Sequence, residues 1–151
     1  MSRPSLYDAV GGAPAMRALA AEFHARCLAD PVLEHPFSHG VNPQHVQRLA
    51  DYWGEVLGGP AVYSARFGGQ EAMIRLHAHQ GAGADYGHRF VACFVAAIDA
   101  AGLPRDPELR SALTAYMTWA TRDVLAFAPP DAVIPVGLTV PRWDFDGLRS
   151  D

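Results

Sequence analysis

The chain has 151 residues, 50% of them hydrophobic and 19% charged, which excludes an intrinsically disordered protein. Its formal charge of −4 comes from 12 arginines against 16 acidic residues, with no lysine and no basic run. We therefore expect neither nucleic acid nor an anionic membrane surface as a partner. No apolar run approaches the roughly 20 residues that span a bilayer, and the N-terminus lacks the apolar run of a secretory signal. These features predict one soluble domain in the cytoplasm.

Hydrophobic periodicity predicts helices through most of the chain. Apolar residues between positions 13 and 29 recur at three- and four-residue steps, and Pro14 suits the first turn of that helix because its missing N–H has no helical partner there. Asn42-Pro43 begins a second helix, which ends at the glycines 58–59. Further helices are predicted around 70–77, at 84–101 and at 107–127. No segment alternates with a period of two, so the predicted fold class is all-α.

Residues 128–151 differ from the rest in composition. They hold four of the twelve prolines and two glycines, which excludes a regular helix, yet they also hold apolar residues. We predict an irregular C-terminal extension that packs on the domain formed by residues 1–127, with Trp143 as its anchor. The alternative is a homodimer contact through the same residues, which are Val136, Leu138, Val140, Trp143 and Phe145.

The two cysteines, Cys27 and Cys93, are too few for a disulfide scaffold, and both fall within apolar helical patterns. We interpret them as small buried hydrophobic residues in preference to metal ligands or a bridge.

Three of the seven histidines, His24, His45 and His77, fall on the apolar faces of three predicted helices. An imidazole buried there costs roughly 1–3 kcal/mol unless it is paired. Taken singly, each is best explained as a hydrogen-bonded core histidine. Taken together with nearby aromatic residues, they suggest helices that line a cofactor cavity. Those aromatic residues are Phe37, Tyr52, Trp53 and Phe90.

The residue types narrow the choice of cofactor. A structural zinc site needs cysteine and histidine spacings that this sequence lacks, and a di-iron bundle needs inward carboxylates that the apolar faces lack. One imidazole facing an apolar slot suits haem. From the residues alone, the prediction is an all-α domain with a haem-type pocket; the alternative is a haemless helical protein that binds an apolar ligand.

Several motifs occur in a characteristic order. They are the stretch from Leu6 to Gly12, the stretch from Leu28 to Leu33, Gly58-Gly59-Pro60 followed by Tyr63-Ser64, the stretch from Met73 to His77, Tyr116 with Trp119, and the stretch from Val140 to Asp144. In these motifs the chain resembles the group II truncated haemoglobins (2-on-2 globins), particularly those with a C-terminal extension. The resemblance covers nearly the whole chain. It implies a two-over-two helical sandwich around haem b.

The resemblance also implies roles for individual residues. His77 matches the proximal ligand of the haem iron, and Arg48 matches the residue that pairs with a haem propionate, the alternative being a solvent-facing helix charge. His45 and Leu49 fall at positions that point at the bound ligand. Core packing explains Phe67 and Phe94 as well as haem contact does. The further expected haem contacts are Phe37, Tyr52, Trp53, Met73 and Phe90, with Phe67 and Phe94 as candidates.

Two positions depart from the family. His24 stands where the family usually has a tyrosine, and Phe90 stands where it usually has a tryptophan. Both usual donors to the bound ligand are lost, so His24 and His45 are the remaining candidates in a distal pocket with Leu49 and Phe90. Because imidazole protonation varies near neutral pH, we expect ligand stabilisation to depend on pH more than is usual for the family. A further hypothesis is that His45 binds the iron when no ligand is present.

These features lead to a haem protein that reversibly binds a diatomic ligand (O2, CO or NO). The alternative is an enzyme, a haem-dependent peroxidase or nitric-oxide dioxygenase, in which His45 or His24 acts as acid and base on peroxide. The sequence contains no flavin or nicotinamide fingerprint, so a reductase would be a separate partner.

Overall fold

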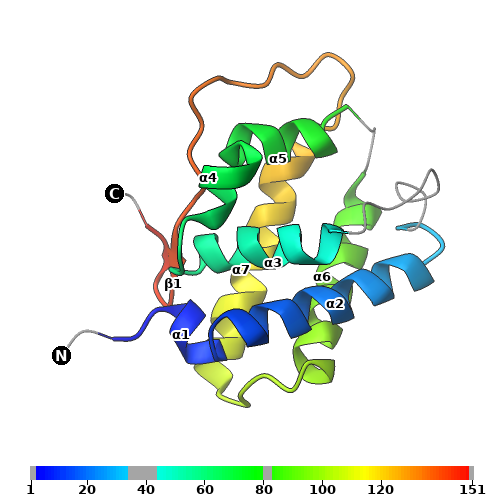
Figure 1. Cartoon of the computed structure of the whole chain (residues 1–151). Coiled ribbons are helices and arrows are strands. Elements are labelled where there is room, and N and C mark those ends of the chain that lie inside the picture. The colour runs from blue at the N-terminus through cyan, green and yellow to red at the C-terminus, as the bar shows by residue number, and fades with distance from the viewer. Residues whose placement is uncertain (1–2, 34–43, 80–82, 150–151) are drawn as a thin grey trace.

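The computed structural model describes residues 3–33, 44–79 and 83–149, which form seven α-helices, and the predicted all-α fold class is confirmed (Figure 1). The helices are α1 (Leu6–Val10), α2 (Ala13–Ala29), α3 (His45–Val56), α4 (Val62–Phe67), α5 (Gly69–His77), α6 (Ala84–Ala100) and α7 (Pro107–Leu125). Two short antiparallel strands, β1 (Trp143–Asp144) and β2 (Gly147–Leu148), pair near the C-terminus. None of the described helices combines the length and apolar character needed to cross a membrane.

The long helices form two crossed layers. In Figure 1, α2 and α3 lie across the front of the molecule, and α6 and α7 run behind them. Helix α2 packs against both α3 and α6, and α6 packs against α7. Phe23 of α2 joins these layers, because its ring lies 5.2 Å from that of Trp53 on α3 and 6.2 Å from that of Phe94 on α6.

Local side-chain chemistry sets several helix ends. Ser5 Oγ accepts a hydrogen bond from Asp8 N at the start of α1, and Asp106 Oδ1 accepts one from Glu108 N at the start of α7. Gly11 ends α1 in the left-handed conformation, with φ of 118°, which a residue with a side chain rarely adopts. Periodicity did not predict α1 or α4, because helices of 5 and 6 residues are too short to show a hydrophobic period.

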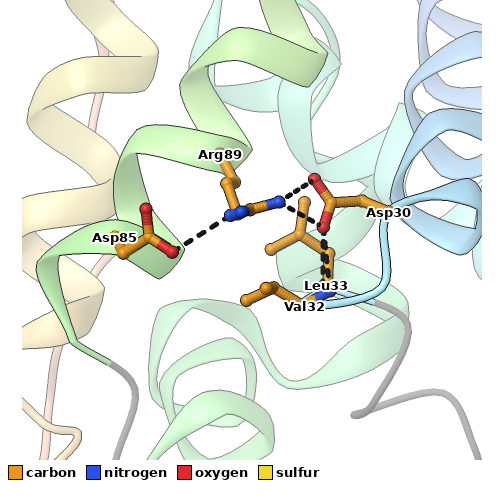
Figure 2. Close-up of polar contacts among 5 residues, drawn as sticks. All are labelled: Asp30, Val32, Leu33, Asp85 and Arg89. Atoms are coloured by element: carbon orange, nitrogen blue, oxygen red, sulfur yellow. Dashed lines mark hydrogen bonds and ion pairs between the residues drawn. The ribbon is translucent and has the colours of Figure 1, made fainter.

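A polar clamp joins the C-terminal end of α2 to the first turns of α6 (Figure 2). Arg89 Nη1 lies 3.0 Å from Asp30 Oδ1, and Arg89 Nε lies 3.0 Å from Asp85 Oδ2. Asp30 Oδ1 also accepts a hydrogen bond from Val32 N at 2.9 Å. Burial acts to raise the pKa of Asp30, but the hydrogen bonds from the Val32 and Leu33 backbone and from Arg89 outweigh it, so the pKa lies below its ordinary value.

The chain after α7 runs beside α5 and α4 before it reaches β1 (Figure 1). Trp143 is buried, and its ring lies 5.8 Å from that of Tyr116 and 5.5 Å from that of Trp119. Arg142 Nη1 donates to Glu55 O at 3.1 Å, which fixes the same segment to the end of α3. At its other end, His79 Nε2 lies 2.8 Å from Ala132 O. These contacts place the C-terminal segment against the helices that carry the cavity described next.

Candidate functional site

A cavity of about 290 Å³ lies among α3, α5, α6 and α7. Most of its lining is aromatic or aliphatic. Six residues that the sequence predicted as cofactor contacts come together in its wall: Leu49, Tyr52, Trp53, Met73, His77 and Phe90. The cavity is therefore built at the place where the sequence patterns converge.

His77 is the last residue of α5 and lines this cavity. Its Nδ1 lies 2.8 Å from Met73 O, one turn earlier, so Nδ1–H donates to the carbonyl and Nε2 carries the lone pair. Burial lowers the pKa of His77, and the hydrogen bond to Met73 only partly opposes this change, although the ring itself is accessible through the cavity. A neutral imidazole whose second nitrogen is held by a carbonyl is the usual state of a histidine that binds a metal.

Arg48 lies on α3 outside the cavity lining, with its guanidinium carbon 4.8 Å from the centre of the Phe67 ring. Among the described residues, none accepts a hydrogen bond from its Nε, although that atom is buried. A buried donor without an acceptor costs about 1–3 kcal/mol, and a carboxylate at this position would supply one. A haem propionate is such a carboxylate, so Arg48 and His77 both have the chemistry that haem needs.

The imidazoles of His24 on α2 and His45 on α3 lie close together, with ring centres 4.8 Å apart. Both side chains are half-buried, and neither lines the cavity directly. Burial lowers the pKa of His24. The pKa of His45 falls to about 4, first because of burial and then because a proton on His45 is repelled electrostatically by His24, His77 and Arg48. Both rings are therefore neutral at pH 7, and each offers one N–H donor and one acceptor nitrogen.

The remaining predicted contacts lie elsewhere. Phe94 is 1% exposed and packs 5.1 Å from Trp53, behind the cavity wall. Phe67 is half-buried between Arg48 and Tyr63. Phe37 lies outside the described residues.

A chain of polar groups that the sequence did not predict crosses one wall of the cavity. Tyr52 Oη donates to Gln70 Oε1 at 2.7 Å, and the hydroxyl of Tyr116 lies near that of Tyr52. Burial raises the pKa of both tyrosines, so both hydroxyls keep their protons. Gln70 is 4% exposed, so its amide oxygen depends on this bond.

Helix α7 supplies the largest part of the lining that sequence reasoning missed. The residues are Tyr116, Met117, Trp119, Ala120, Thr121, Asp123, Val124 and Leu125. Their spacing follows the helical period, but a core face and a cavity face have the same spacing. The other missed lining residues are Phe23, Val32, Gln70, Tyr86, Gly87 and Ala128.

Two crossed helical layers around an apolar cavity, with an anchored neutral histidine in its wall, define a globin-type haem pocket. Residues 5–124 match the family of bacterial-like globins, and the chain belongs to that family. Globins hold haem and bind diatomic ligands at its iron. No curated protein sequence matches the chain.

Solved structures agree with this assignment. The haemoglobin of Chloroflexus aurantiacus is 29% identical, with a TM-score of 0.70 over 81% of this chain and 98% of the other. A thermostable haemoglobin from Thermobifida fusca is 26% identical, with a TM-score of 0.67 over 89% and 100%. The group II truncated haemoglobin of Bacillus anthracis, 16% identical, shares the fold with a TM-score of 0.73 over 82% and 92%. The chain is a haem-binding protein with the truncated 2-on-2 globin fold.

Proposed function

We propose that this protein binds haem b through His77 and reversibly binds oxygen, or another diatomic ligand such as CO or NO, on the opposite side of the haem. The observation that carries the proposal is the His77 ring, whose Nδ1 is held by Met73 O while the ring lines the cavity. Bound haem iron supplies the ligand-binding chemistry. The protein supplies the proximal nitrogen, an apolar wall and hydrogen-bond donors.

Arg48 holds one haem propionate in this proposal. Its buried Nε has no acceptor among the described residues, and its guanidinium is positioned by the Phe67 ring. The predicted contacts that line the cavity cover the apolar faces of the haem; they are Leu49, Tyr52, Trp53, Met73 and Phe90. Phe94 supports this wall from the core through Trp53.

On the distal side, His24 and His45 take the place of the hydroxyl and indole donors usual in this family. Each neutral ring donates through a single N–H, and the 4.8 Å separation of the ring centres lets one ring orient the other. We also propose that His45 binds the iron when no other ligand is present. Ferric spectra of wild type and His45→Ala test this point. Six-coordinate iron in wild type, with five-coordinate or water-bound iron in the variant, supports the proposal. Identical high-spin spectra contradict it.

The central test is a titration with haemin followed by absorption spectra of the ferric, reduced and CO-bound forms. Wild type is expected to bind haemin tightly with a strong Soret band, and His77→Ala to lose tight binding. His88→Ala is the matched control, because His88 is an exposed histidine on α6 that does not line the cavity. An unchanged spectrum and affinity in His77→Ala would refute the proximal assignment.

A second candidate function is a peroxidase or a nitric-oxide dioxygenase served by a separate reductase. The low pKa of His45 favours it, because a ring that is neutral at pH 7 can accept the proton of a bound peroxide, next to His24. Steady-state peroxide turnover, compared in wild type and His45→Ala, separates the two. Slow turnover with stable oxygen binding supports the carrier or sensor, whereas fast turnover that needs His45 supports the enzyme.

A further inference from the structure

The two cysteines of the chain, far apart in sequence, meet between α2 and α6. The side chains of Cys27 and Cys93 lie close enough for each to affect the ionisation of the other. Cys27 is 0% exposed, whereas Cys93 is partly exposed. Both residues are free thiols. From the sequence they were interpreted as small buried hydrophobic residues in preference to a bridge, and the packing of α2 against α6 brings them together.

Contacts near both residues hold the two helices in register at this point. The rings of Phe23 and Phe90 stack with centres 5.7 Å apart, one turn before Cys27 and Cys93. Asp30, one turn after Cys27, pairs with Arg89, one turn before Cys93 (Figure 2). Because these contacts fix α2 against α6, the sulfurs are neighbours throughout the folded state.

We propose that Cys27 and Cys93 form a reversible disulfide that links α2 to α6 when the protein meets hydrogen peroxide. Cys93 reacts first because it is the accessible thiol of the pair. Its thiolate attacks one peroxide oxygen, the S–O bond forms, the O–O bond breaks, and the hydroxide that leaves takes the thiol proton as water.

Cys27 then completes the reaction. Its sulfur attacks the sulfenic sulfur of Cys93, the S–S bond forms, the S–O bond breaks, and a second water leaves with the Cys27 proton. In total, two thiols lose two electrons to one peroxide, and one disulfide and two waters result.

The surroundings of Cys93 set the rate of the first step. Burial raises the pKa of Cys93, and Asp30 acts in the same direction, while the neighbouring Cys27 side chain and the charges of Arg26 and Arg89 oppose the change. The thiolate fraction at pH 7 is therefore small, and oxidation is expected over minutes to hours rather than seconds.

The disulfide acts on the cavity wall. Phe23 and Phe90 both line the cavity, and each lies one turn from a cysteine. His24 lies on α2 in the same turn as Phe23. A covalent link restricts the movement of α2 against α6 at this wall, and we expect it to change CO association by about twofold or more, in the range of coupling between neighbouring sites.

Peptide mapping of the oxidised holoprotein tests the bond directly. After peroxide treatment, iodoacetamide blocks the remaining thiols, and trypsin without reductant cuts after Arg26, Arg48, Arg89 and Arg105. Cys27 then lies in peptide 27–48 and Cys93 in peptide 90–105. The expected result is one cross-linked pair of these peptides in monomeric protein, absent when iodoacetamide precedes peroxide and lost on reduction with dithiothreitol.

Unfolding and ligand kinetics give independent readouts. Closing a loop of about 66 residues is expected to raise the melting temperature by roughly 10 °C. The CO association rate should change in the same oxidised sample, and the changes in melting temperature and in association rate should both reverse when the disulfide is reduced. Cys93→Ser, at the more accessible position, is the control in which neither change occurs; if Cys27→Ala fails to fold, the wild-type peptide map still decides.

Three results would overturn the disulfide: sulfinic acid on Cys93 with unmodified Cys27, dimers linked through Cys93 alone, or thiols that persist in the folded protein but cross-link after denaturation. Equal CO association rates in the oxidised and reduced forms would overturn the coupling to the cavity.

Discussion

The buried hydrogen bond from Tyr52 to Gln70 predicts a specific loss of stability in Tyr52→Phe. The variant keeps the aromatic ring and removes only the hydroxyl that donates to Gln70 Oε1 at 2.7 Å. It leaves the buried Gln70 amide oxygen without its partner. An unsatisfied buried polar group costs about 1–3 kcal/mol, and the expected loss of stability is therefore about 1–3 kcal/mol.

Tyr63→Phe is a matched control for this change. Tyr63 is 5% exposed and its ring meets that of Tyr52 edge to face, with centres 5.1 Å apart, but its hydroxyl makes no hydrogen bond to the described residues. The same loss of one oxygen should therefore cost under about 0.5 kcal/mol there. A double variant, Tyr52→Phe with Gln70→Met, removes both partners of one bond and should lose less than the sum of the two single variants.

Urea unfolding of the haemin-saturated protein measures these differences, with the same excess of haemin for every variant because bound ligand adds to stability. For a chain of this size, 1–3 kcal/mol corresponds to a fall in melting temperature of very roughly 3–10 °C. If Tyr52→Phe and Tyr63→Phe unfold at the same urea concentration, the hydrogen bond from Tyr52 to Gln70 does not stabilise the cavity wall, and the reasoning fails.

Three further predictions concern the haem edge, the distal pair and the C-terminal segment. Arg48→Met should speed haem dissociation about tenfold, because it removes a charge-assisted hydrogen bond to the propionate. Arg66→Met, which changes an exposed arginine, should leave the dissociation rate unchanged. Equal dissociation rates in the two variants would contradict the propionate assignment. Because the pKa of His45 is about 4, the unfolded chain binds a proton between pH 6.5 and 4 that the folded chain does not, so stability falls as pH drops through this window. Unfolding curves at several pH values should show a smaller fall in His45→Gln, and an identical fall would contradict the shift. Trp143→Ala should lower the free energy of unfolding by about 3–5 kcal/mol, because the side chain is buried. Val136→Ala is the control, because Val136 is 82% exposed and its loss should cost under about 0.5 kcal/mol. Similar losses in the two variants would show that Trp143 does not anchor the C-terminal segment.

The sequence predicted the long helices well because their signals are local. The first of them runs from Ala13 to Ala29 in both the prediction and the structure. Pro14 acts through backbone chemistry that one residue decides, and it lies in the first turn of α2 as predicted. The predicted start at Asn42-Pro43 lies outside the described residues, and α3 begins at His45 after Gln44. The short helices α1 and α4 were not predicted, because 5 or 6 residues are too few to show a hydrophobic period.

Periodicity says which face of a helix is apolar, but not what that face meets. Phe90 and Phe94 lie one turn apart on α6, yet Phe90 lines the cavity and Phe94 is 1% exposed in the core. The sequence predicted Phe90 as a contact and left Phe94 open between haem contact and core packing, because the spacing is the same for a cavity wall and for a packed core.

By itself, the sequence determined that the chain is helical, which residues face inward, and that His77 ends a short helix rich in apolar residues. Only the tertiary structure decided which inward residues meet. The histidine pair of His24 and His45 and the thiol pair of Cys27 and Cys93 both arise where α2 crosses another helix. The physical reason is that a helical period depends on neighbours three and four residues apart, whereas the crossing of two helices depends on how whole surfaces pack.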